Sequence, residues 1–231
     1  MTDHGTPAPT RRTVLTAAGS AAVAALAAAL ATACGSPAAS RAGAPKPPGA
    51  AAEPGCVLVT TAGSGPYYSG PGKRRSDITE GQAGVPLRLE LTVVGVKSGC
   101  RPLTGATVDV WQADAQGVYS QNGATHLRGS QVTDASGRCV FETIVPGWYA
   151  GLAPHVHFKV RPASGGETTS VFYLPEDMLR QVYARQPYAR RKAPADPNGR
   201  DGRYRSSGAA MTLAPVAHGA GYRAAYTVGI A

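Results

Sequence analysis

The chain has 231 residues, which is enough for one ordinary domain with its own hydrophobic core and a leader. Its formal net charge is +9, but the Lys and Arg residues are spread out and form no recognised nucleic-acid-binding motif, so we expect no nucleic acid among its partners. Ten of its aromatic residues are Tyr, against three Phe and two Trp, and Tyr is the aromatic residue that also ligates metals.

Residues 1–34 have the pattern of an export signal. Arg11 and Arg12 precede an alanine-rich apolar run that extends to about Ala33, which resembles a bacterial twin-arginine signal. Small residues before Cys34 resemble a lipoprotein cleavage site, although the apolar residue lies one position too far upstream. Both a lipid anchor on Cys34 and plain cleavage near it stay open. We expect an extracellular or cell-surface bacterial protein.

Residues 35–54 are rich in Pro, Ala, Gly and Ser, a composition typical of a flexible tether. Three cysteines follow the leader: Cys56, Cys100 and Cys139. The cell exterior permits a disulfide, but the sequence leaves open which two of the three pair. No C-x-x-C occurs, so the spacing does not indicate a zinc site.

Residues 55–231 have the pattern of one all-β domain, an antiparallel β-sandwich with long active-site loops and a short helix. Apolar and polar residues alternate over 88–96 and 107–111, as in half-buried strands. Turn signals such as Lys97-Ser98-Gly99 and Pro146-Gly147 separate the segments. Further strands are expected at 131–133, 139–144, 156–160, 170–174 and 226–230, and the helix at 176–184, with Pro175 in its first turn.

Three aspartates invite a structural interpretation. Asp109 and Asp114 could form a carboxylate pair for hydrolysis, but their positions instead predict an outward-facing strand residue and a turn former, respectively. Asp134, followed by Gly137, predicts a hairpin turn.

A candidate metal site lies within residues 119–157. His155 and His157 alternate along one predicted strand, so both imidazoles point to the same face and can meet one ion. A lone His-x-His is more often part of a core or surface. Here, however, Tyr149 follows the Pro146-Gly147 turn, and Tyr119 lies in the loop after strand 107–111. Taken singly, each Tyr is more simply explained as a buried side chain with a hydrogen-bonded hydroxyl than as a metal ligand.

Together these motifs resemble the intradiol ring-cleavage dioxygenases, specifically their secreted branch. The resemblance covers nearly the whole chain after the leader. Its segments are GPYY (65–68), RSDITEG (75–81), GATVDVWQADAQGVYS (105–120), LRGSQVTDASGR (127–138), VPGWYAGLAPHVHFKV (145–160), DGRY (201–204) and GYRAAYTVGI (221–230).

The resemblance implies an Fe(III) cofactor bound by Tyr119, Tyr149, His155 and His157. Two phenolates are hard anionic donors that favour Fe(III) over Fe(II). The implied substrates are a small catechol and O2, and the ring is cleaved between its two hydroxylated carbons to a cis,cis-muconate. Tyr149 would leave the iron as it takes a proton, and Tyr119 would stay bound. Tyr67 and Tyr68 would line the pocket.

Two positions depart from the family pattern. Leu152 stands where the family usually has an Arg, and Val171 where it usually has a Gln. Three interpretations stay open. Another cation, such as Arg128, serves as a substitute; or the substrate is more electron-rich and needs less stabilisation; or the chain binds iron and catechols but cleaves slowly. The last is the alternative function, an exported iron- and catechol-binding β-sandwich with little or no turnover. A carbohydrate-binding or adhesion domain is a third hypothesis.

Overall fold

The computed structural model describes residues 56, 58–193 and 195–231, so the predicted leader and tether lie outside the described residues. No helix in these ranges has the length and apolar character needed to cross a bilayer. The elements, in chain order, are β1 Pro86–Gly95, β2 Arg101–Pro102, β3 Thr107–Trp111, β4 Arg128–Val132, β5 Arg138–Ile144, β6 His155–Arg161, β7 Thr168–Tyr173, α1 Glu176–Tyr183, the single turns η1 Tyr188–Arg190, η2 Asn198–Arg200 and η3 Tyr204–Gly208, then β8 Val216–His218 and β9 Gly221–Ile230.

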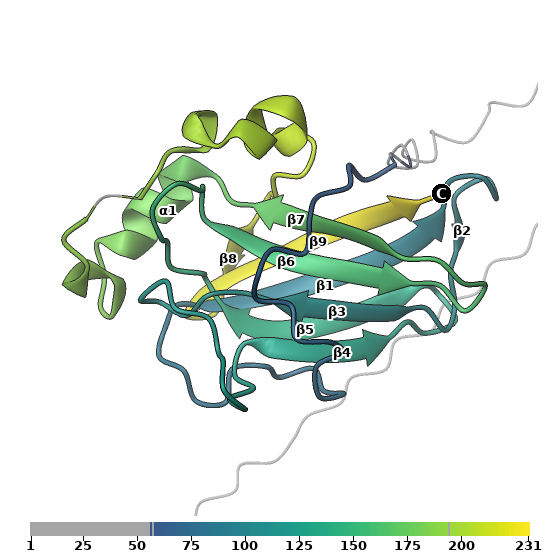
Figure 1. Cartoon of the computed structure of the whole chain (residues 1–231), viewed down its shortest axis with the longest axis horizontal. Coiled ribbons are helices and arrows are strands. Elements are labelled where there is room, and N and C mark those ends of the chain that lie inside the picture. The colour runs from purple at the N-terminus through teal and green to yellow at the C-terminus, as the bar shows by residue number, and fades with distance from the viewer. Residues whose placement is uncertain (1–55, 57, 194) are drawn as a thin grey trace, which may run out of the picture. The chain divides into compact units, whose positions relative to one another are not determined.

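The strands form two sheets (Figure 1). One sheet has the order β2-β1-β9-β8, with β5 paired along β1, and the other has the order β4-β3-β6-β7. The pairs between these strands are antiparallel except for β1 and β9, the first and last long strands, which run parallel. The predicted all-β sandwich is confirmed.

The core lies between the two sheets because alternate residues of each strand are apolar. In β1, Leu87, Leu89 and Leu91 are almost fully buried, whereas the residues between them are partly exposed. Phe172 of β7 stacks on Phe158 of the neighbouring β6, and its ring lies 4.9 Å from that of Tyr226 on β9 in the opposite sheet. These contacts fix β6, the strand that carries both histidines, against the core.

The outer face of β6 and β3 is covered by residues 58–77, here called the N-terminal strap (Figure 1). The strap is tied to both edges of the sheet: Ala62 donates its N–H to Thr169 of β7, and Arg75 donates its N–H to Ser130 of β4. This cover explains why His155, His157 and Lys159 are buried although they point away from the core. The strap thus encloses the face on which the candidate site lies.

Several local predictions are confirmed. Asp114 accepts the N–H groups of Gln116 and Val118, as a turn former does. Asp134 closes the β4–β5 hairpin, where Gly137 has a φ of +71°. Helix α1 begins at Glu176, with Pro175 as its N-cap rather than in its first turn. Glu176 and Asp177 in that turn suit the positive end of the helix dipole.

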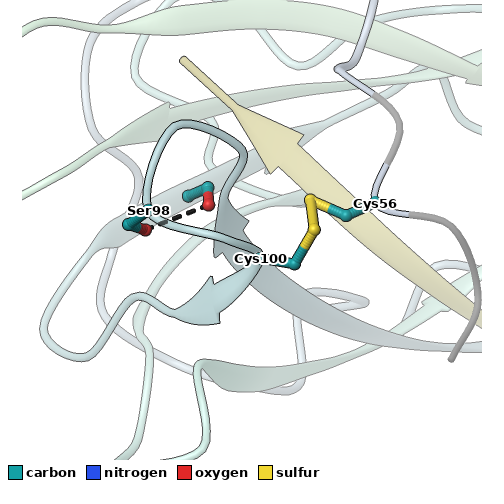
Figure 2. The surroundings of a disulfide bond; sticks show 4 residues. Cys56, Ser98 and Cys100 are labelled. Carbon is teal, nitrogen blue, oxygen red and sulfur yellow. Dashed lines mark hydrogen bonds between the residues drawn. A yellow bond between two sulfur atoms is a disulfide. The ribbon is translucent and has the colours of Figure 1, made fainter.

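The structure selects one of the three cysteine pairings: Cys56 is bonded to Cys100 (Figure 2). Cys139 is free and buried on β5. The two bonded Cα atoms lie 5.7 Å apart, within the usual range. Cys100 follows a tight turn in which Ser98 Oγ donates to the carbonyl of Gly95. The bond therefore ties Cys56, just before the strap, to the turn between β1 and β2.

Loss of this disulfide should lower stability. The bond closes a loop with a sequence separation of 44 residues, so the double variant Cys56→Ser, Cys100→Ser should lose about 2–4 kcal/mol of unfolding free energy. Denaturant titration followed by circular dichroism measures the loss. Reductant should lower the stability of the wild type and leave that of the double variant unchanged. Equal midpoints for wild type and double variant would contradict the prediction.

Candidate metal centre

The structure brings the four predicted ligands together. The Tyr119 and Tyr149 hydroxyls lie 3.4 Å apart, Tyr149 Oη lies 3.2 Å from His155 Nε2, and the two histidine Nε2 atoms lie 3.0 Å apart. No group of three or more His, Cys, Asp or Glu side chains suited to a metal occurs among the described residues. A cation at this centre would therefore need the tyrosines. Their role as ligands stays a prediction.

The two tyrosines are held by loops that touch. Tyr119 follows the turn at Asp114, whose carbonyl accepts the N–H of Gly147 just before Tyr149. At Gly147 a Cβ would lie 2.5 Å from the Asp114 carbonyl oxygen, and at Gly117 a Cβ would lie 1.9 Å from the Trp148 carbonyl oxygen. Only glycine allows this approach, and the approach sets the separation of the two phenols.

The histidines are oriented by strand β6 and by the backbone before it. His155 and His157 lie on one face of the strand, as predicted. His155 donates its Nδ1–H to the carbonyl of Ala153 over 2.7 Å, so its Nε2 presents a lone pair to the centre. His157 stacks on Trp111 of the neighbouring β3, with 4.8 Å between ring centroids and 2° between ring planes. Two nitrogen and two oxygen donors thus converge, a set that fits Fe(III).

Burial controls the protonation of the donors. It lowers the pKa of His155 to about 4 and that of His157 to about 2, so both imidazoles are neutral near pH 7 and available as ligands. Burial also raises the pKa of Tyr119 and of Tyr149, so both are phenols when no cation is bound. A bound cation would supply the attraction that removes these protons.

Comparisons with known proteins show the family to which the chain belongs. A family described as "Dioxygenase" matches residues 64–184, more than half of the chain. A solved intradiol ring-cleavage dioxygenase from Tetranychus urticae is 26% identical, with a TM-score of 0.72 over 76% of this chain and 94% of its own. This chain belongs to the intradiol ring-cleavage dioxygenases.

Other members of the intradiol family show how far the likeness extends. The dioxygenase domain of a dioxygenase–carbohydrate-binding fusion from Streptomyces sp. SirexAA-E is 28% identical, with a TM-score of 0.57 over 76% of this chain and 100% of its own. Catechol 1,2-dioxygenase 1 of Acinetobacter lwoffii is 29% identical over 47% of this chain and 42% of its own length. The protocatechuate 3,4-dioxygenase beta chain of Burkholderia cepacia is 32% identical over 42% of this chain and 49% of its own length. Each match spans less than half of the curated relative.

A cleft of about 500 Å³ lies beside the centre of this intradiol dioxygenase. Tyr67 and Tyr68 of the strap line it, and so do Lys73, Ser120 and Arg128. That this cleft receives the substrate stays a prediction. The Tyr67 ring stacks on that of Tyr119, with 4.5 Å between ring centroids, so the Tyr67 side chain borders both the cleft and the metal centre.

The two departures from the intradiol pattern lie close to the histidines. Val171 of β7 is buried and pairs directly with His157, and Leu152 is partly exposed just before Ala153. Arg128, the substitute cation considered above, donates Nε–H to Ser120 Oγ and Nη2–H to the Ser120 carbonyl. Its guanidinium therefore holds the loop that carries Tyr119.

Asp109 faces away from the core, as predicted, because its neighbours Val108 and Val110 are the core residues of β3. Asp109 is nonetheless only 1% exposed, because the strap covers it. Asp109 Oδ2 accepts hydrogen bonds from the Tyr68 hydroxyl and from Arg161 Nη2, both at 2.7 Å. The carboxylate thus anchors the strap to the sheet. Neither this role nor that of Trp111 was predicted, because each depends on a partner distant in sequence.

Proposed function

We propose that this chain is a non-haem Fe(III) dioxygenase that cleaves catecholic rings between the two hydroxylated carbons, consuming O2 and giving cis,cis-muconate-type products. The observation that supports it most is the convergence of Tyr119, Tyr149, His155 and His157, with successive donor separations of 3.4, 3.2 and 3.0 Å. When bound there, ferric iron would favour the catecholate form of the substrate and make its ring electron-rich.

The two tyrosines have different roles in this proposal. Tyr119 is 4% exposed and stacked on Tyr67, so it is held in place as a permanent ligand. Tyr149 is only partly buried, and its hydroxyl lies between the Tyr119 hydroxyl and His155 Nε2. Tyr149 is therefore the phenol that can move aside and hold a substrate proton on Oη.

The surrounding aromatic side chains would position a flat substrate and exclude water. Tyr67 covers Tyr119, and Trp111 covers His157. Gly65 of the strap faces the His157 ring edge, where a Cβ would lie 3.5 Å from Cε1 and Nε2. A planar ring is the ligand shape that such walls accept.

We also propose that the protein is exported by the twin-arginine route and acts outside the cell, with or without a lipid on Cys34. The disulfide between Cys56 and Cys100 supports this, because such bonds persist in oxidising compartments.

Iron content, colour and oxygen uptake together test the enzymatic proposal. The iron-loaded full chain should be burgundy to red-brown from tyrosinate–Fe(III) charge transfer, and it should consume O2 with at least one member of a panel of catechol, protocatechuate and hydroxyquinol. A folded protein that takes up no iron and stays colourless would overturn the proposal. Leu152 and Val171, which depart from the family pattern, support one alternative function, an iron- and catechol-binding module without turnover. A coloured protein whose spectrum shifts with catechol but which consumes no O2 would establish that alternative.

A further inference from the structure

The proposed centre lacks the cation that its family usually places beside the histidines, because Leu152 stands at that position. With a substrate proton held on Tyr149, the Tyr119 phenolate and a doubly deprotonated catechol carry three negative charges, equal to the three positive charges of a ferric ion, and the catecholate ring is electron-rich. In a site shielded from water, a nearby fixed cation stabilises such an arrangement strongly. Two arginines near the centre are already engaged, Arg128 with Ser120 and Arg161 with Asp109.

Arg203 lies in a small cavity of about 220 Å³ alongside the histidine strand. Val171 and Tyr173 of β7 line the same cavity, and they pair with His157 and His155, respectively, across the β6–β7 ladder. The Tyr173 ring also lies edge-on to the His155 ring, with 6.3 Å between centroids. Two residues that line the cavity are thus the direct strand partners of the two histidines.

One buried carboxylate fixes both Arg203 and a ligand. Asp201 Oδ1 accepts the N–H of Arg203 at 2.8 Å and lies 3.8 Å from its guanidinium Nε. Asp201 Oδ2 accepts the N–H of Ala153 at 3.2 Å, and the Ala153 carbonyl accepts the Nδ1–H of His155 at 2.7 Å. The position of Arg203 is therefore coupled to the orientation of His155.

Part of the Arg203 guanidinium has no protein partner. Its Nη2 is buried and makes no hydrogen bond, an arrangement that usually needs an explanation. The part of the guanidinium that is not paired with Asp201 is therefore available to an anion at the centre.

We propose that Arg203, positioned by Asp201, supplies the positive charge that stabilises an anionic catecholate at this centre. The inference rests on the proposed function, because it assumes that catechols bind there as anions. It adds a pair of residues outside the four ligands, and it places the charge on the β7 side of the histidines.

Anaerobic titration with catechol measures this role without turnover. The variant Arg203→Met should bind iron with the wild-type visible spectrum, bind catechol at least about tenfold more weakly, and turn over about a hundred- to a thousand-fold more slowly. The matched control is Arg200→Met, which removes an exposed arginine from the same segment and should behave as wild type. Iron-loaded Arg203→Met with catechol affinity and rate within twofold of Arg200→Met would overturn the inference.

Two further variants separate charge from structure. Arg203→Lys keeps the charge, and Arg203→Gln keeps a hydrogen-bonding side chain without it. Lys should retain most of the catechol affinity and Gln should lose it; equal affinities would overturn the inference even if Arg203→Met failed to fold. The proposed function is judged on the wild type alone. A wild type that binds catechol without consuming O2 would end the enzymatic proposal, while the titrations would still decide the role of Arg203.

Discussion

The variant His157→Ala is expected to fold but to lose the iron and its colour. The substitution removes one of the four converging donors and leaves His155 Nε2 without its neighbour at 3.0 Å. It also removes the ring that stacks on Trp111. Since loss of a residue that only supports a ligand costs about 10–100-fold in metal affinity, loss of a ligand should cost more. Iron analysis and the visible spectrum measure the effect, and oxygen uptake should be undetectable.

His218→Ala is the matched control, because His218 is exposed on β8 and lies outside the centre. It should keep full iron content, colour and activity. Circular dichroism of both variants establishes that the sheets are intact. If a folded His157→Ala retained one iron per chain with the wild-type spectrum, the ligand assignment would be wrong.

The variant Gly117→Ala should disrupt the metal centre, although Gly117 is not one of the four donors. Gly117 has a φ of +78°, which alanine adopts only with strain, and the added Cβ would lie 1.9 Å from the carbonyl oxygen of Trp148. The Tyr119 and Tyr149 loops must then separate. We expect iron binding to be largely lost although no ligand has changed, together with a loss of about 1–3 kcal/mol of stability. Iron content and thermal unfolding report the two effects separately.

Gly123→Ala separates steric clash from backbone strain. Gly123 also has a positive φ, +87°, but a Cβ there would meet nothing within 4 Å. It should lose some stability from strain and keep its iron. Similar iron loss in the two variants would show that the contact between the loops does not set the distance between the phenols.

Strands with strong alternation were predictable from the sequence. The predicted strand 107–111 coincides with β3, and the segments 139–144 and 156–160 fall inside β5 and β6. Strand β8 gave no such signal, because all three of its residues are exposed. The two-residue strand β2 is too short for any period to show. Alternation of apolar and polar residues reveals a strand that buries one of its two faces. It therefore misses a strand such as β8, in which both faces are exposed.

From residue patterns alone, the candidate site was predictable only where its spacing is local, and Tyr119 was added by the family resemblance. His155 and His157 follow from strand geometry, and Tyr149 from the turn just before them. The pairing of Asp109 with Arg161 joins residues 52 positions apart, and the position of Arg203 depends on Asp201 reaching Ala153 across 48. Such contacts are set by how the chain packs. The DGRY segment at 201–204 is part of the family resemblance, but its residue types alone do not predict a position near the four donors.

The buried thiol of Cys139 has a consequence for the order in which the protein matures. Burial raises the pKa of Cys139 to about 12, and the pairing of Cys139 with Leu91 places it within the β1–β5 ladder. Apart from Cys34, a chain oxidised before this ladder forms has three thiols, those of Cys56, Cys100 and Cys139, that can combine in three ways. A chain oxidised afterwards has only one pair within reach. Folding first and meeting an oxidant second would therefore give a single product without help from an isomerase.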